Sequence, residues 1–128
     1  MILSLITAAA TPAGPQWNCQ SPAVQQEMNY CAQQEFLQAD AALNGQWRKT
    51  AAEMKQRDAD RDTSLDDRPG YFSTLLTAQR AWLKYRDAHC VGQGYSFRGG
   101  SMEPLIVSTC KTALTEERTN QLKDLIEQ

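Results

Sequence analysis

Apolar side chains recur at helical spacing in the N-terminal half of this chain, and this pattern limits the fold more than any other feature. Each lies three, four or seven residues after the one before it, which places all of them on one face of an α-helix. Ser21 and Pro22 precede them as an N-cap and a first helical residue. A helix over Pro22–Met54 is therefore predicted, and its apolar face comprises Met28, Ala32, Phe36, Ala39, Leu43, Trp47 and Met54.

Three further helices are predicted, and two of them are short. The second helix covers Tyr71–Cys90 and is expected to pack antiparallel to the first. The charged stretch 55–70 between them is interpreted as a frayed helix end followed by a solvated loop. A short third helix follows Ser101, and Thr115 is the predicted N-cap of a fourth. The expected fold is an all-α bundle of two long antiparallel helices and two shorter C-terminal helices.

Four cysteines occur in 128 residues, and an even count in a short exported chain indicates two disulfides. Three connectivities are possible. We predict local pairing, Cys19 with Cys31 and Cys90 with Cys110, because each bond then closes a short loop. In the chain-entropy account each such bond stabilises the fold by roughly 3 kcal/mol.

Neither a metal nor a cofactor is expected. A zinc site is disfavoured because the chain has no C-x-x-C pair and His89 is its only histidine. Asp58, Asp60 and Asp62 alternate as in a calcium loop, but the glycine and the distal glutamate that such a loop requires are missing.

The N-terminal segment resembles the distal half of a secretory signal peptide. Ile2–Ala10 is apolar, and small residues that suit a cleavage site follow within residues 1–14. The competing interpretation is a buried N-terminal strand or helical turn. We expect residues 1–14 to be a signal-peptide remnant and 15–128 to form one domain that is periplasmic or secreted. No stretch is long and apolar enough for a membrane span.

Gln79 and Arg86 fall on the apolar face of the second predicted helix. A buried guanidinium must be paired and hydrogen-bonded, or it costs several kcal/mol. Asp40, at the edge of the first helix's apolar face, is the expected partner, and Glu35 is the alternative. We interpret Asp40, Gln79 and Arg86 as a structural polar core. No catalytic residues are expected. Catalysis needs a nucleophile, a base and an oxyanion donor in one cleft, and the sequence indicates no such set.

A glycine-rich segment, Gln93–Ser101, follows the second helix and is the candidate for binding a partner. Tyr95 and Phe97 are possible anchors, and Ser96 and Arg98 are possible hydrogen-bond donors. The alternative is that the two aromatic rings simply cap the end of the bundle. With a formal net charge of −2 and no basic stripe, the chain is not expected to bind nucleic acid.

An ordered set of motifs resembles the LprI-type domain family over roughly Cys19 to Leu125. The set consists of C-x11-C, AD-x2-LN at Ala39-Asp40 and Leu43-Asn44, AQRAWLKYRDAHC at 78–90, GGSMEP, Cys110 and LTEERTNQL. The chain departs from the family in having Trp47 where a tyrosine is usual, and in lacking a lipidation cysteine.

The resemblance implies an exported helical domain without enzymatic activity that binds and inhibits a lysozyme-type muramidase. Its partner would be lysozyme or another cationic envelope protein. The alternative function is a periplasmic interaction or envelope-stress module that does not inhibit lysozyme. The sequence specifies no oligomeric state.

Overall fold

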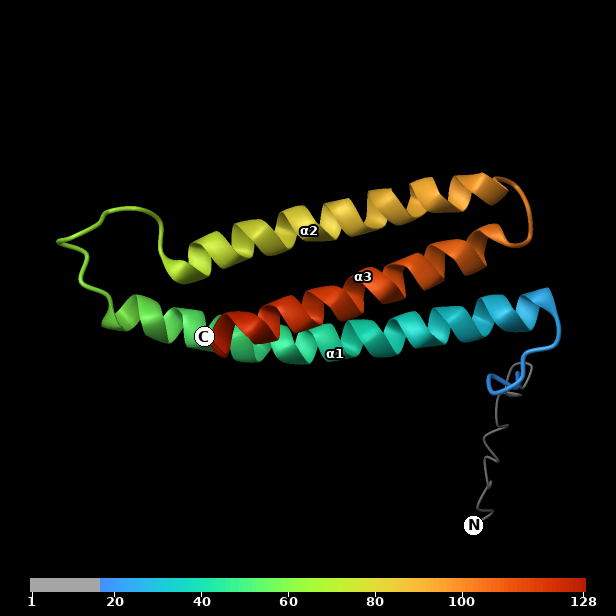
Figure 1. Ribbon diagram of the computed structural model, residues 1–128, viewed down its shortest axis with the longest axis horizontal. Coiled ribbons are helices and arrows are strands. Elements are labelled where there is room, and N and C mark those ends of the chain that lie inside the picture. The colour runs from blue at the N-terminus through green and yellow to red at the C-terminus, as the bar shows by residue number, and fades with distance from the viewer. Residues whose placement is uncertain (1–16) are drawn as a thin grey trace, which may run out of the picture.

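Three long helices lie side by side in the computed structural model, which describes residues 17–128 (Figure 1). They are α1 (Gln25–Asp60), α2 (Tyr71–Gly94) and α3 (Glu103–Ile126), with a short 3-10 turn, η1 (Tyr95–Phe97), after α2. Helix α2 runs antiparallel to α1, and α3 returns parallel to α1. Residues 17–128 contain no strand, so the all-α fold class is confirmed. The predicted signal-peptide remnant, 1–14, lies outside the described residues.

Helix α1 begins and ends later than the predicted Pro22–Met54. At its start the buried Glu27 reaches back and accepts the backbone N–H of Ala23 at 2.7 Å and of Asn18 at 3.0 Å. Beyond Met54 the helix continues to Asp60, through residues interpreted as a frayed end. Hydrogen bonds four residues apart support this last part, from Arg57 to Glu53 at 3.3 Å and from Gln56 to Asp60 at 3.2 Å.

The start of α2 is capped by a side chain from α1. Both carboxylate oxygens of Asp58 accept backbone N–H groups of the first turn, from Tyr71 at 2.6 Å and from Phe72 at 3.0 Å. The N-cap residue, Gly70, offers no side chain of its own, and a Cβ there would lie 2.5 Å from an Asp58 oxygen. The close approach of Asp58 therefore requires glycine at this position.

The two shorter C-terminal helices are a wrong prediction, because α3 is one continuous helix. Thr115, the expected N-cap of the last helix, lies inside α3 and is fully buried. Its hydroxyl accepts a hydrogen bond from Arg86 of α2 at 3.3 Å. A threonine followed by two glutamates resembles a helix start, but here the tertiary contact satisfies the hydroxyl and no cap is needed.

The apolar core lies where the three helices meet nearer the α1–α2 loop. Helix α1 makes its most extensive contact with α3 and a smaller one with its antiparallel neighbour α2. Thr50, fully buried, donates from its hydroxyl to the backbone oxygen of Leu122 at 2.8 Å, which joins α1 to α3. The buried cluster comprises Leu43, Met54, Leu75 and Leu122, with Trp47, Phe72, Trp82, Leu125 and Ile126 packed against it.

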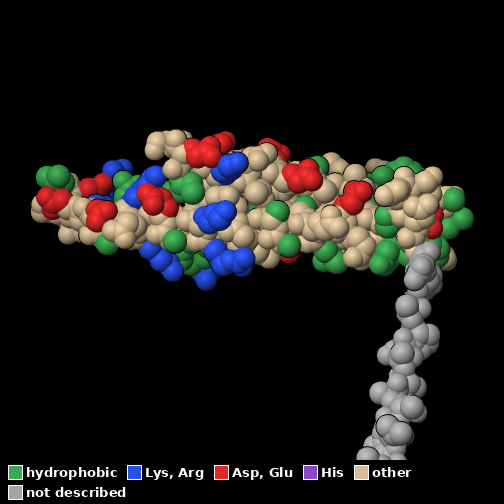
Figure 2. All heavy atoms as spheres, turned by 90° about the horizontal axis from the view of Figure 1, so that it is seen from below, with side chains coloured by type: hydrophobic (Ala, Val, Ile, Leu, Met, Phe, Trp, Pro, Cys, Tyr) green, Lys and Arg blue, Asp and Glu red, His purple; other side chains and the backbone are tan. Residues whose placement is uncertain are grey.

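The disulfides lie at the opposite end of the bundle and pair as predicted. Cys19 bonds Cys31 with their Cα atoms 5.3 Å apart, and Cys90 bonds Cys110 with theirs 5.4 Å apart. The second bond joins the last turns of α2 to the first turns of α3. On the face drawn in Figure 2, charged side chains are dense over the left and middle of the molecule and sparse at the right-hand, disulfide-bonded end.

Replacing Asp58 by Ala should lower the thermal midpoint at pH 7, because two N–H groups of α2 lose their acceptor. The N–H of Phe72, together with that of Tyr71 and with the nearby Arg61 guanidinium, holds the pKa of Asp58 below its usual value. A lowered pKa means that the ionised cap stabilises the fold above the unfolded-state pKa of about 3.9 and ceases to do so as the pH falls through the folded-state pKa.

Thermal melts from pH 7 to pH 2 test this, with Asp67→Ala in the same loop as the control. The deficit of Asp58→Ala relative to wild type should shrink in the acidic range, and Asp67→Ala should melt near the wild type throughout. A deficit that stays constant down to pH 2 would show that the ionised cap is not the cause.

Candidate functional site

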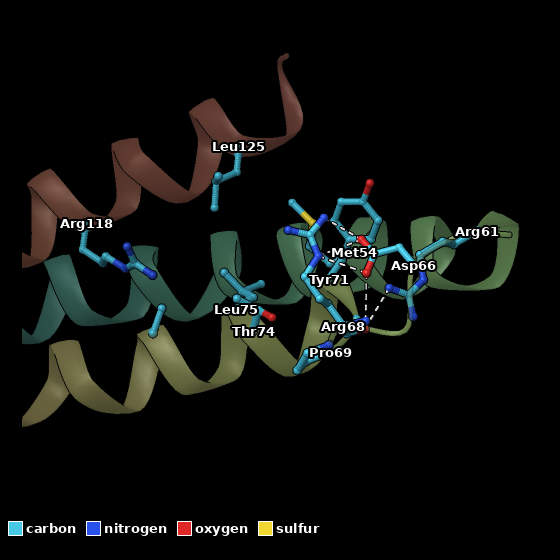
Figure 3. A pocket seen from close by; sticks show the side chains of 12 residues that line it. Met54, Arg61, Asp66, Arg68, Pro69, Tyr71, Thr74, Leu75, Arg118 and Leu125 are labelled. Atoms are coloured by element: carbon cyan, nitrogen blue, oxygen red, sulfur yellow. Dashed lines mark hydrogen bonds and ion pairs between the residues drawn. The ribbon is translucent and has the colours of Figure 1, made fainter. Parts of the chain in front are cut away.

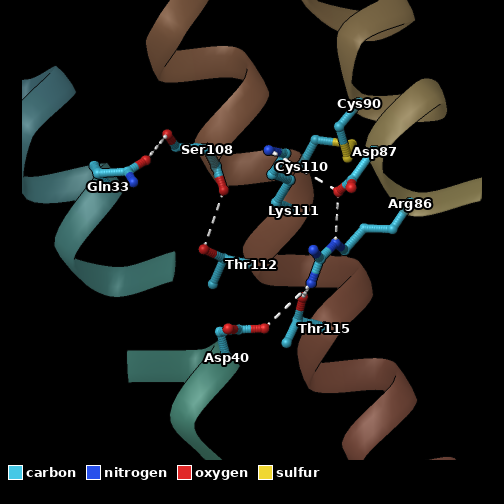
Figure 4. Close-up of polar contacts among 10 residues, drawn as sticks. All are labelled: Gln33, Asp40, Arg86, Asp87, Cys90, Ser108, Cys110, Lys111, Thr112 and Thr115. Atoms are coloured by element: carbon cyan, nitrogen blue, oxygen red, sulfur yellow. Dashed lines mark hydrogen bonds and ion pairs between the residues drawn. A yellow bond between two sulfur atoms is a disulfide. The ribbon is translucent and has the colours of Figure 1, made fainter. Parts of the chain in front are cut away.

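Arg86 is the centre of a polar cluster that joins all three helices (Figure 4). It is 7% exposed. Its Nη1 donates to Asp40 Oδ1 of α1 and to Thr115 Oγ1 of α3, each at 3.3 Å, and its Nε donates to Asp87 Oδ1 at 3.0 Å. The sequence predicted Asp40 as the first partner of Arg86, and in the structure Asp40 is bonded to Arg86. Asp87 and Thr115 were missed, although Asp87 directly follows Arg86.

The rest of the Arg86 surroundings is aromatic. The guanidinium carbon lies 5.1 Å from the ring centre of Phe36 and 5.2 Å from that of Trp82. Contacts of this kind favour a cation, more so where water is excluded. Lys111 lies 4.0 Å from the Asp87 carboxylate, on the outer side of the cluster.

Gln79 does not belong to this cluster, contrary to the expectation from the helical wheel. It is buried, but its side-chain oxygen accepts from Nε of Arg118 at 2.9 Å, on α3. Gln79 and Arg86 lie two helical turns apart on α2, and each meets a different part of α3. Arg118 was not predicted as the partner of Gln79. Thr115 was expected to begin a separate helix, and that expectation did not say which residues of this region face α2.

We propose a structural role for the Arg86 cluster, because its hydrogen bonds join α2 to α1 and to α3. His89 is exposed and stacks on Tyr85 with ring centres 5.2 Å apart. All four cysteines are in disulfides, so no thiol is available as a nucleophile. Residues 17–128 hold no group of three or more His, Cys, Asp or Glu side chains placed to bind a metal ion.

The predicted binding segment is shorter and more ordered than a loop over Gln93–Ser101. Gln93 and Gly94 are the last residues of α2, and Tyr95–Phe97 form η1. The turn then closes through backbone bonds from Arg98 N–H to the oxygen of Tyr95 at 3.2 Å and from Gly100 N–H to that of Phe97 at 2.8 Å. Gly99 has φ +79°, which favours glycine there.

This turn is fixed to the helices on both sides. Asn29 of α1 donates from its amide to the backbone oxygen of Ser101 at 2.9 Å. Gly94 is buried so closely against α3 that a Cβ would lie 2.6 Å from a Val107 methyl. Cys90, one turn earlier, is bonded to Cys110. The turn between α2 and α3, including η1, is therefore held in a fixed position relative to the helices.

The four side chains singled out in the sequence all face solvent. Tyr95 is 50% and Phe97 40% exposed, and Ser96 and Arg98 are exposed as well. The Arg98 guanidinium lies 4.4 Å from the centre of the Tyr95 ring. Among residues 17–128 no carboxylate forms an ion pair with Arg98. An exposed cation stacked on one exposed aromatic ring, with a second exposed ring beside it in the sequence, is thus available to an anionic partner. We name Tyr95–Arg98 the end turn.

Arg86→Ala should lower the free energy of unfolding by about 3–5 kcal/mol, because it removes a buried guanidinium that bonds Asp40 of α1 and the fully buried Thr115 of α3. Asp40→Ala should cost less, since Arg86 keeps Asp87 and Thr115 as partners. Urea denaturation measures both, with the exposed Arg80→Ala on the same helix as the control. A loss under roughly 1 kcal/mol for Arg86→Ala, as for a surface pair, would contradict the structural role.

Comparison with known proteins identifies a family and a relative. Residues 17–122 match the family described as "Lysozyme inhibitor LprI". The chain is also 40% identical over 128 residues to "Uncharacterized protein R02472" of Rhizobium meliloti (strain 1021), an alignment that covers 98% of this chain and 92% of the relative. No solved structure matches. The family match includes all four cysteines, the Arg86 cluster and the end turn, and the chain therefore belongs to the LprI lysozyme inhibitor family.

Proposed function

We propose that this protein is an exported, non-enzymatic inhibitor that binds lysozyme-type muramidases. Membership of the LprI family supports the activity. The two disulfides support a periplasmic or secreted location, because such bonds persist in oxidising compartments. Within residues 17–128, no helix has the length and apolar character to cross a bilayer.

The observation that carries the proposal is the exposed Arg98 on the end turn, which forms no ion pair within residues 17–128. Lysozyme cleaves its substrate with two carboxyl groups that flank the scissile bond in a cleft. A guanidinium presents several donors in a planar fork that suits a carboxylate. Arg98 inserted into the cleft would bind those carboxyl groups, with Tyr95 and Phe97 packed against its walls. Substrate would then be excluded from the reacting groups.

The order of the end turn also favours tight binding. Its backbone bonds, the Asn29 contact and the Cys90–Cys110 disulfide hold it before a partner arrives. Less conformational entropy is lost when a rigid segment binds than when a flexible one does. On the face drawn in Figure 2, the few charges at this end leave little to repel an enzyme surface, and the net charge of −2 favours encounter with a cationic lysozyme.

The acidic stretch 58–67 is the weaker candidate for the same role. Asp58 caps α2, Asp62 accepts from Ser64 at 2.6 Å, and Asp66 pairs with Arg68. These carboxylates already have partners within the protein. Binding a cationic enzyme through them would require those contacts to break or be shared.

Arg98→Ala, Tyr95→Ala and Phe97→Ala, tested singly, should each weaken inhibition at least tenfold, or about 1.4 kcal/mol. Arg98→Glu should weaken it further, because it opposes the cleft carboxylates. The measurement is the inhibition constant in a lysozyme assay on bacterial cell walls. Thermal midpoints should stay near that of the wild type, because all three side chains are exposed.

The matched controls are Arg80→Ala and Tyr85→Ala, an arginine and a tyrosine exposed on the middle of α2. Both should inhibit as the wild type does. If the end-turn variants inhibit fully, the turn is not the binding site. If the wild type fails against several classes of lysozyme, inhibition is not the function, and the envelope interaction module takes its place.

A further inference from the structure

A cavity lies at the end of the bundle opposite the end turn, between the helices and the α1–α2 loop (Figure 3). Its volume is about 730 Å³, within the range of small-molecule sites. Its apolar lining comes from all three helices, with Met54 of α1, Leu75 and Ala78 of α2 and Leu125 of α3. An apolar body of moderate size would be buried here.

The charged side chains around this cavity are mainly positive. Arg61, Arg68 and Arg118 line it, against the single carboxylate of Asp66. Arg68 pairs with Asp66, with its Nε 2.8 Å from the carboxylate. The net charge of the protein is −2. The lining of this apolar cavity has three arginines and one aspartate, so its local net charge is positive instead.

Two of these arginines have no carboxylate bound to them among residues 17–128. The Nε of Arg61 is buried without a hydrogen-bond partner, a state that normally costs free energy. Arg118 is half-buried and is held only by neutral oxygens, of Gln79 at 2.9 Å and of Gln121 at 3.1 Å. Burial lowers the pKa of Arg118, in the direction expected of a cation that lacks a counter-charge. The nearby Asp58 is occupied in capping α2.

We propose that this cavity binds a small amphipathic anion, with an oxyanion head at Arg118 and an aliphatic body on the Met54, Leu75 and Leu125 surface. The head supplies a counter-charge for Arg118, whose hydrogen-bond partners in the structure are neutral oxygens. The apolar lining supplies the contact for the body. A fatty carboxylate and an alkyl phosphate share this chemistry.

The cavity and the end turn lie at opposite ends of the bundle, so this proposal does not depend on lysozyme inhibition. In Figure 3 Arg61, Asp66, Arg68 and Tyr71 gather at the loop side, with Leu75, Leu125 and Arg118 farther along the helices. The purified protein alone suffices for the test. If the cavity binds no anion, the proposed lysozyme inhibition is unaffected. If the protein does not inhibit lysozyme, the proposed anion site is unaffected.

Calorimetric titration with octanoate tests the proposal. The wild type should bind octanoate at least tenfold more tightly than octanol, which has the same chain length but no charge, and than acetate, which has the head alone. Octyl phosphate in a parallel titration distinguishes the two heads, and tighter binding of either supports the proposal. Inorganic phosphate bound as tightly as octyl phosphate would overturn it, because the apolar body would then contribute nothing.

Two variants locate the site. Arg118→Gln removes one guanidinium, and Ala78→Trp fills the cavity from an exposed helix position. Each should weaken octanoate binding at least tenfold. The matched controls, Arg80→Gln and Ala81→Trp, lie on exposed positions of α2 outside the cavity and should bind as the wild type does. No binding by the wild type, or equal binding by Ala78→Trp and Ala81→Trp, would overturn the proposal.

Discussion

The guanidinium of Arg86 hydrogen-bonds side chains on all three helices, and we propose that it sets their relative positions. It extends from α2 to a carboxylate on α1 and a hydroxyl on α3, with aromatic rings of Phe36 and Trp82 beside it. A buried charge has few places where its desolvation is offset. It therefore tolerates little change in helix register. The apolar cluster around Leu43 and Leu122 adds stability on the loop side of this charge, but apolar contacts alone specify register less strictly.

The cluster divides the bundle into two ends of different chemistry. On one side lie both disulfides and the end turn, with few charges on the face drawn in Figure 2. On the other lie the long loop, the cavity and its arginines. Because Cys90 is one turn from Arg86, the disulfide and the buried charge together fix the end of α2 from which the end turn extends. We place the proposed lysozyme-binding surface at that end because Tyr95, Phe97 and Arg98 are exposed there.

Much of this architecture was predictable from the sequence, because it rests on local patterns. Periodic apolar residues predicted α1 and α2, and the short separations between cysteines in the sequence predicted the disulfides. The wrong predictions concern features that depend on contacts between segments far apart in the sequence. Thr115 resembles a helix start until Arg86 is seen to bond its hydroxyl. Gln79 faces Arg118 only because α3 is continuous. The arginine-lined cavity combines residues of three helices and a loop, and no spacing in the sequence indicates it.

Hydrogen–deuterium exchange on the complex with lysozyme tests the central claim most directly, because it reports the contact on both proteins at once. If the end turn enters the cleft, amides of residues 95–101 should exchange more slowly in the complex. Peptides that line the lysozyme cleft should be protected to match, while residues 61–71 keep the exchange rates of the free protein. Protection confined to residues 61–71, or to a lysozyme surface away from its cleft, would contradict the account.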